Sequence, residues 1–327
     1  MLDQAAFSTP KRRYAPAIHI KAVMQTFGIG IVFLAICVFF ALSSEFFLTW
    51  NNLSNVLRQS SINGILAVGV TFVVLTGGID LSVGSVMALA GAIAGSLLTL
   101  SSPYPLPLGI AAGFAVGALC GWLSGTLVAY LRLPSFVATL GMLSMARGLT
   151  LIYTDGRPIP NLLPAFKWIG GGSVAGLPVP ALVLFGVFVL AWVTLKHTTF
   201  GRHVFAVGGN ERAARASGVS TKRVTTMAYI VSGVLAGLGG LLLTARTTAA
   251  LPQAGVGYEL DAIAAVVIGG TSLAGGRGTL VGSLFGALII GTLNNGMDLL
   301  GISSNYQQFL KGAIIIAAVV VDRSRKQ

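Results

Sequence analysis

Long apolar runs recur along almost the whole chain, and they constrain its fold more than any other feature. A helix needs about 20 apolar residues to cross the hydrocarbon core of a bilayer. Ten segments of about this length qualify as spans: residues 26–43, 62–79, 83–101, 105–131, 134–153, 177–195, 225–246, 260–275, 279–299 and 304–321. With 54% hydrophobic and 9% charged residues, the chain cannot be a set of soluble domains. The sequence therefore predicts an all-α, polytopic membrane helix bundle of about ten transmembrane helices.

A basic, polar island at residues 196–223 is the main interruption of this pattern. It holds six of the 21 Lys and Arg residues and one acid, Glu211. A segment of this charge does not dissolve in hydrocarbon, so it marks a loop on one side of the membrane. We expect a single transmembrane domain at residues 26–321 that contains this loop, with tails at residues 1–25 and 322–327.

The distribution of Lys and Arg predicts the orientation, because cytoplasmic loops carry an excess of both. With the N-terminus inside and alternating spans, 15 of the 21 basic residues fall on the cytoplasmic side. The others lie outside (Arg58, Arg157, Lys167) or within or at the ends of spans (Arg147, Arg246, Lys311). The island and both tails are thus expected on the cytoplasmic side of the membrane. The net charge of +12 follows from this topology and does not indicate nucleic-acid binding.

The short motifs of several enzyme classes are missing from the sequence. The glycine-rich stretch at residues 275–279 lacks the lysine and the spacing of a nucleotide-binding loop. The three histidines do not form a His-Glu-x-x-His helix, and there is no Gly-x-Ser-x-Gly elbow. Cys37 and Cys120 lie in apolar runs, where a thiol behaves as a small hydrophobe. We expect no catalytic site and no cofactor or metal ion in this chain.

Glycine placement predicts both close helix packing and interrupted spans. Gly109, Gly113, Gly117, Gly121 and Gly125 form a bare stripe along one face of the span at 105–131. Such a stripe allows another helix to approach closely. The spans at 62–79 and 260–275 each contain a Gly-Gly pair, and we interpret them as short, glycine-broken spans near a translocation path.

Polar side chains within the spans are candidates for the substrate path. Uncharged hydrogen-bonding groups suit a polyhydroxylated substrate, and they occur at Asn63, Thr71, Asn294 and Asn295. Hydrogen bonds between helices would explain the same residues equally well.

Charged residues at the edges of spans have simpler explanations. The acids Asp80, Glu259, Asp261 and Asp298 fall at span ends, where we expect them to be hydrated or to cap a helix. Arg147 and Lys311 lie further inward, and we expect them to snorkel or to pair with a neighbouring helix.

The island contains the signals of a short helix. Asn210 can cap its N-terminus, Glu211 in the first turn suits the helix dipole, and Gly218 supplies a left-handed stop. These signals predict two helical turns over residues 210–217. Such a helix could dock in a groove of a cytoplasmic partner, or it could rest on anionic lipid headgroups.

Several stretches make the chain resemble the permease subunits of ribose-type bacterial ATP-binding-cassette sugar importers. The resemblance starts near residue 45 and is carried by Glu45-Phe46-Phe47 with Asn51-Asn52-Leu53, by residues 76–85, 136–140, 147–148 and 208–211, and by residues 258–276 and 293–296. It implies a dimer of two permease copies, a cytoplasmic ATPase that holds ATP and Mg, and a periplasmic sugar-binding protein. It also implies that the island contacts the ATPase through Gly209, Asn210, Glu211, Arg212, Ala213, Ala214 and Gly218.

We therefore expect a permease that moves ribose or a related monosaccharide into the cytoplasm by alternating access. A branched-chain amino acid permease would share the glycine-rich late segment, but the run at residues 76–85 argues against it. An ion-coupled secondary transporter would need carboxylates in the middle of its spans, and none of the acids is clearly placed there. A passive channel would need a filter sequence that the chain lacks.

Overall fold

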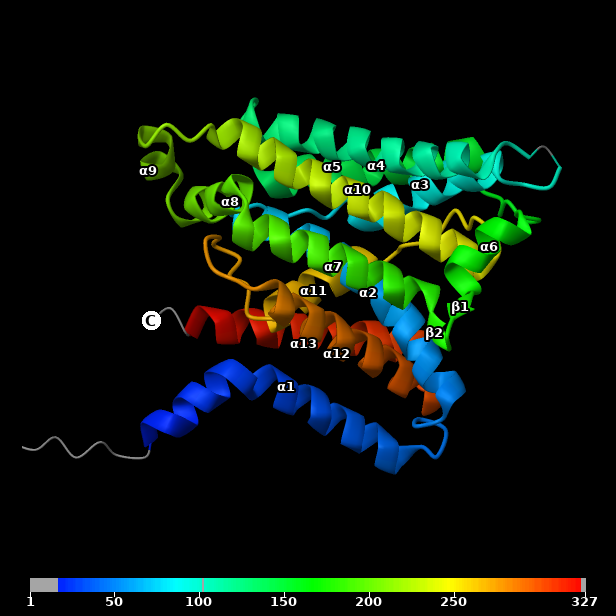
Figure 1. The fold of residues 1–327 in the computed structure, drawn as a ribbon, viewed down its shortest axis with the longest axis horizontal. Coiled ribbons are helices and arrows are strands. Elements are labelled where there is room, and N and C mark those ends of the chain that lie inside the picture. The colour runs from blue at the N-terminus through cyan, green and yellow to red at the C-terminus, as the bar shows by residue number, and fades with distance from the viewer. Residues whose placement is uncertain (1–16, 102, 325–327) are drawn as a thin grey trace, which may run out of the picture.

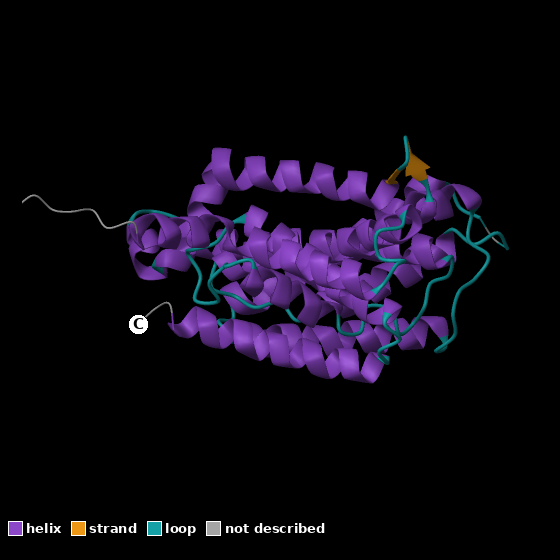
Figure 2. Ribbon diagram, turned by 90° about the horizontal axis from the view of Figure 1, so that it is seen from below, coloured by secondary structure: helices purple, strands orange, loops and turns teal. Residues whose placement is uncertain are grey.

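The computed structural model describes residues 17–101 and 103–324, and this part of the chain is almost entirely helical (Figures 1 and 2). The helices are α1 (Ala17–Ser43), α2 (Trp50–Leu75), α3 (Val83–Leu97), α4 (Leu106–Ala129), α5 (Ser135–Thr154), α6 (Pro164–Gly171), α7 (Val179–His197), α8 (Thr199–Gly209), α9 (Glu211–Ala216), α10 (Thr221–Thr247), α11 (Tyr258–Ile268), α12 (Leu280–Leu299) and α13 (Ser304–Ser324). The strands β1 (Ser173–Val174) and β2 (Leu177–Pro178) form a small antiparallel hairpin. The prediction of an all-α membrane bundle is confirmed.

Each of the ten predicted spans coincides with a helix, but the number of full-length spans is not confirmed. Six of the described helices are long and apolar enough to cross a membrane: α2, α4, α5, α7, α10 and α12. The helices α3 and α11 have 15 and 11 residues. At about 1.5 Å per residue they reach roughly 22 and 17 Å, less than the hydrocarbon thickness of about 30 Å. These two helices cover only part of the membrane.

Helix α2 forms the centre of the bundle. Every residue from Ser60 to Leu75 is buried, as expected for a helix that is surrounded by protein on all sides. Its neighbours include α7, α10, α11 and α12. The outer helices α4, α5 and α7 instead expose large apolar side chains such as Trp122, Phe136 and Phe185, which is appropriate for a lipid-facing surface.

The chain is not helical between α2 and α3, and this corrects the interpretation of the predicted span at 62–79. Helix α2 has 26 residues and begins twelve residues before that span, so it is not short. Gly77 and Gly78 follow its end and do not interrupt it. The segment at residues 76–82 then leads to α3, whose first turn packs against Gly255 and Glu259. The corresponding prediction for 260–275 is closer to the structure, because α11 is short and ends just before Gly269.

The glycine stripe on α4 does pack against another helix, as predicted. Its middle residues Gly117 and Gly121 contact the backbone of α10 at Gly233 and Tyr229. The interface between α4 and α10 is the most extensive helix pair in the described chain. In Figure 1 these two helices cross along the upper side of the molecule.

The two ends of the bundle differ in structure. One end carries α8 and α9, and the described parts of α1 and α13 begin and finish on the same side, at the left of Figure 1. The opposite end carries α6 and the β1–β2 hairpin, which Figure 2 places at the right. We call these the α9 end and the α6 end. Helix α1 already begins at Ala17, within the predicted tail at 1–25; residues 1–16 and 325–327 of the predicted tails lie outside the described residues.

Candidate functional site

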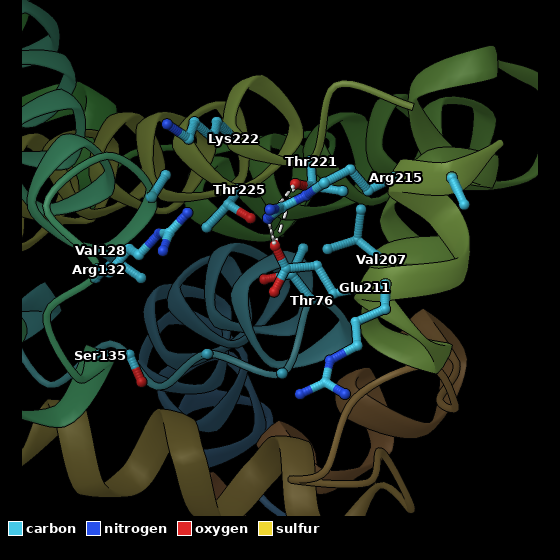
Figure 3. A pocket seen from close by; sticks show the side chains of 15 residues that line it. Thr76, Val128, Arg132, Ser135, Val207, Glu211, Arg215, Thr221, Lys222 and Thr225 are labelled. Atoms are coloured by element: carbon cyan, nitrogen blue, oxygen red, sulfur yellow. Dashed lines mark hydrogen bonds and ion pairs between the residues drawn. The ribbon is translucent and has the colours of Figure 1, made fainter. Parts of the chain in front are cut away.

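Helix α9 has the caps that the sequence predicts, and it is one residue shorter at each end than the predicted range 210–217. The side chain of Asn210 accepts a hydrogen bond from the backbone N–H of Ala213 at 3.0 Å, which satisfies one of the free donors of the first turn. Gly218 follows the helix with φ +84°, the left-handed conformation in which glycine has no Cβ penalty. Glu211 accepts hydrogen bonds from Arg215 at 2.5 Å and from Thr221 at 3.1 Å. This last contact, visible in Figure 3, ties α9 to the first residue of α10.

The coupling residues that the resemblance implies lie on α9 and directly beside it, at the α9 end of the bundle. Gly209, Asn210, Glu211, Arg212 and Ala213 are exposed, as is Gly218, whereas Ala214 is buried against the bundle. The sequence reasoning missed α8, which precedes α9 in the island. The signal was present, because Thr198 precedes the helix and its hydroxyl accepts a hydrogen bond from the N–H of Gly201 at 3.2 Å.

The end of α8 lies directly on the end of α2. A Cβ on Gly208 would overlap the carbonyl oxygen of Leu75, the last residue of α2. The same carbonyl accepts a hydrogen bond from the N–H of Gly276 at 2.9 Å, and Gly276 also contacts Gly209. Three segments that are far apart in the sequence therefore meet backbone to backbone: the end of α8, the end of α2 and the loop between α11 and α12. A displacement of α8 cannot be absorbed by side chains at this junction.

The four predicted substrate-path residues lie in the interior, on the facing helices α2 and α12. Thr71 donates a hydrogen bond to Ser283 at 2.8 Å, and Asn295 exchanges two hydrogen bonds with Asn52, at 2.8 and 3.0 Å. Asn294 donates to Asp261 at 3.3 Å. The side-chain oxygens of Asn63 and Asn294 are buried and have no hydrogen-bond partner among the described residues. Thr71 and Asn295 thus join helices in this state, while Asn63 and Asn294 keep an acceptor free.

Of the two expectations for Asp80 and Asp261, hydration is wrong, whereas a position at the start of a helix agrees with the structure. Asp80 accepts a hydrogen bond from the N–H of Ser82, the residue before α3, and Asp261 lies in the first turn of α11. Asp80 is only 2% exposed, and it accepts hydrogen bonds from Ser82 at 2.6 Å and from Ser232 at 2.7 Å. Asp261 is 4% exposed, and its Oδ2 atom forms an ion pair with the Nζ atom of Lys311 at 3.0 Å. Both acids are buried because the non-helical segment at 76–82 and the short helix α11 bring the ends of helices inside the bundle.

Both inward basic residues bind protein groups, but only Lys311 pairs with a neighbouring helix, as one of the two expectations stated. Lys311 of α13 reaches Asp261 of α11. Arg147 of α5 donates hydrogen bonds to the carbonyl oxygens of Pro252 and Ala254, at 2.8 and 2.9 Å. These carbonyls belong to the non-helical segment between α10 and α11, so Arg147 provides partners for backbone groups that a membrane interior would otherwise leave unsatisfied.

The comparison with protein families gives a match over most of the chain. Residues 52–319 match the family described as branched-chain amino acid transport system / permease component. The chain is 48% identical to the ribose import permease protein RbsC of Escherichia coli K12, over 87% of this chain and 89% of that protein. It is 39% identical to the D-allose transport system permease protein AlsC of the same organism, over 90% of each chain.

A third relative carries a broader name. The probable ABC transporter permease protein YphD of Escherichia coli K12 is 40% identical, over 93% of this chain and 90% of that protein. No solved structure matches the chain.

Proposed function

The chain belongs to the family of branched-chain amino acid transport system permease components, and from this premise we propose that it imports ribose or a related monosaccharide. It is the permease subunit of a sugar importer of the ATP-binding-cassette type, a multi-pass protein of the bacterial inner membrane. The observation that carries this conclusion is the identity of 39–48% to permeases named for ribose and allose, over about nine-tenths of the chain. The family description names amino acids, but these closer relatives are named for sugars.

The buried acids do not favour an ion-coupled transporter. Such a transporter needs a carboxylate that is free to bind a proton or sodium ion in the membrane. Asp80 is occupied by two serine hydroxyls and one backbone N–H, and Asp261 by Lys311 and Asn294. Import driven by a separate ATPase requires no such site in this chain.

We propose that α9 is the element through which the ATPase moves the permease. The exposed residues Gly209, Asn210, Glu211, Arg212, Ala213 and Gly218 would contact the ATPase, and the buried Ala214 would hold the helix against the bundle. Support comes from the junction behind it, where Gly208 lies against the end of α2 and the loop before α12. A push on α9 would be transmitted through α8 to both segments, because backbone atoms are already in contact there.

The other components of the assembly follow from the same proposal. Two copies of this permease would form one pathway, with ATP and Mg bound by the ATPase and with a periplasmic binding protein delivering the sugar. The α9 end and both termini would face the cytoplasm, and α3, α11, α1 and α13 would complete ten membrane segments with the six long helices. Membrane lipid would cover the exposed apolar side chains of the outer helices that the second copy leaves free.

For the substrate path we propose Asn63, Thr71, Asn294 and Asn295, with different roles. Asn63 and Asn294 have free amide oxygens that can accept hydrogen bonds from sugar hydroxyls. Thr71 and Asn295 would have to exchange a partner on a neighbouring helix for the substrate, which suits groups that bind sugar only when the helices rearrange.

Uptake in reconstituted vesicles tests the importer function. With the ATPase and the binding protein present, labelled ribose should accumulate only when ATP is supplied, and an ionophore should have no effect. Uptake that an ionophore abolishes and that is indifferent to ATP and to the binding protein would contradict the proposal.

Two substitutions in the island test the coupling role of α9. Glu211→Ala removes the contacts to Arg215 and Thr221, and Gly218→Pro is incompatible with φ +84°. We expect membrane insertion and ATP hydrolysis to persist while uptake falls by about tenfold. A factor of this size corresponds to a typical coupling free energy between two sites. Glu45→Ala, an exposed acid at the opposite end, is the matched control and should leave uptake unchanged. Normal uptake in both island variants would refute the coupling role.

A further inference from the structure

A cavity of about 770 Å³ opens at the α9 end, behind the coupling helix (Figure 3). Its walls come from α9, the start of α10, the corner between α4 and α5, and the segment that follows α2. The volume lies in the range of ligand sites, which is about 300–1,000 Å³. None of the proposed substrate-path residues lines it.

The cavity is strongly basic. Arg132, Arg212, Arg215 and Lys222 line it together with a single acid, Glu211. Arg215 is engaged by Glu211, and the ammonium group of Lys222 lies 5.1 Å from the ring centre of Tyr130. Within residues 17–101 and 103–324, Arg132 and Arg212 form no ion pair. Two guanidinium groups from different walls therefore remain available to an anion.

Arg132 lies in the turn that ends α4, where the N–H of Leu133 donates to the carbonyl oxygen of Leu127 at 3.2 Å. Arg132 has φ +57°, a conformation that non-glycine residues rarely adopt and that would suit asparagine or glycine better. The result is visible in Figure 3, where the side chain extends into the cavity from the corner between α4 and α5. This turn places the guanidinium group of Arg132 in the lining of the cavity.

Hydroxyl groups supply the uncharged polar part of the lining. Thr76, Ser135, Thr221 and Thr225 face the same space as the cations. Ser135 and Thr221 are also the first residues of α5 and α10, so the positive ends of two long helices add to the field of the guanidinium groups. Guanidinium forks with hydroxyl donors are the chemistry that recognises phosphate groups in proteins.

We propose that this cavity binds a phosphate-bearing ligand, with the phosphate held by Arg132 and Arg212. The phosphate can belong to a soluble phosphorylated compound or to a lipid headgroup. The binding itself does not depend on the transported substrate. Its consequence rests on the proposed function: a ligand that bridges Arg212 of α9 and Arg132 at the corner between α4 and α5 would restrain the coupling helix and slow import.

Binding is measured on the full-length permease in phosphatidylcholine nanodiscs by isothermal titration calorimetry. The probes are inorganic phosphate and ribose 5-phosphate, with free ribose as the neutral control. We expect both phosphates to bind, and each of Arg132→Gln and Arg212→Gln to weaken their affinity about tenfold or more, the effect of losing one charge-assisted hydrogen bond. Arg277→Gln, an exposed arginine that does not line the cavity, is the matched control and should bind normally.

A second lipid composition distinguishes a lipid headgroup from a soluble phosphorylated compound as the source of the phosphate. In phosphatidylglycerol nanodiscs a lipid ligand would occupy the cavity, so both soluble probes should bind more weakly there than in phosphatidylcholine nanodiscs. A soluble ligand would bind equally in both compositions. If neither phosphate binds in either composition, and the permease itself retains no bound phosphatidylglycerol, the proposal is overturned. Equal weakening by Arg277→Gln, or equal binding of free ribose, would overturn it as well. None of these readouts requires transport, so a failed uptake assay cannot be confused with a failed binding site.

Discussion

Substituting one glycine at the contact between α4 and α10 should destabilise the bundle by an amount that the geometry sets. A Cβ on Gly117 would lie 2.9 Å from the carbonyl carbon of Gly233 and 3.1 Å from the N atom of Gly237, and closer still to the carbonyl oxygen of Gly233. Carbon atoms in favourable contact are about 3.5–4.0 Å apart, so the helices must separate by at least about 0.6 Å. A gap of this size forfeits about a quarter to a half of the dispersion energy at each affected contact.

The expected cost of Gly117→Ala is about 2 kcal/mol, within the 1–3 kcal/mol typical of overpacking. It is measured as the free energy of unfolding of the permease in detergent. The matched control is Gly186→Ala on α7, where an added Cβ meets no atom within 4 Å. Because alanine has the higher helix propensity, by about 1 kcal/mol, this control should be neutral or slightly stabilising.

A double substitution makes the test sharper. A Cβ on Gly233 would overlap the carbonyl oxygen of Gly117, so both substitutions push on the same contact. Once the helices have separated for one methyl group, the second should cost less, and the two effects should fall short of additivity by at least about 0.5 kcal/mol. The close-packing argument would be refuted if the Gly117→Ala variant were no less stable than the Gly186→Ala variant. It would also be refuted if the losses in unfolding free energy of Gly117→Ala and Gly233→Ala were strictly additive.

Three further perturbations have expected outcomes. Ser232→Ala removes a partner of the buried Asp80 and should cost about 1–3 kcal/mol in unfolding free energy, whereas Ser124→Ala, whose equally buried hydroxyl has no partner among the described residues, should cost less. Lys311→Met leaves Asp261 buried without its cation and should cost about 3 kcal/mol, while Arg157→Met in the exposed pair with Asp155 should change stability by less than about 0.5 kcal/mol. Asn210→Ala should weaken α9 by about 1 kcal/mol. This is measured as amide hydrogen exchange at Ala213, which should be faster than in the control variant Arg277→Ala. For each of the three pairs, equal effects of the variant and its control would contradict the corresponding assignment.

Local signals explain why α9 was predictable to within a residue at each end. Its cap, its first-turn acid and its stop residue lie within nine positions of one another, and each acts through its immediate neighbours. The same holds for the glycine stripe, whose period shows that one face of α4 is bare without showing what covers it. The resemblance to sugar permeases was equally accessible, because it rests on continuous stretches of sequence.

Contacts between distant segments explain what the sequence did not reveal. One partner of Asp80, Ser232, lies 152 positions away in the sequence, and the local partner Ser82 does not show that the carboxylate is buried. The first half of α2 looked unlike a span because it contains Asn52, Arg58 and Ser60, yet Asn52 is paired with Asn295 of α12. The cavity is lined by four separate segments, and Arg132 stood out in the sequence only as one cytoplasmic charge among fifteen.

The bonding of Asp80 also has a consequence for the order in which the chain is assembled in the membrane. A ribosome releases α3 and its preceding segment long before it has made α10, which carries Ser232. Until then the carboxylate lacks this partner, and α3 is too short to be stable in lipid alone. We therefore expect the segment from residue 76 to the end of α3 to enter the bundle as a late step, once α10 has been inserted. The last half of the protein completes the folding of the first.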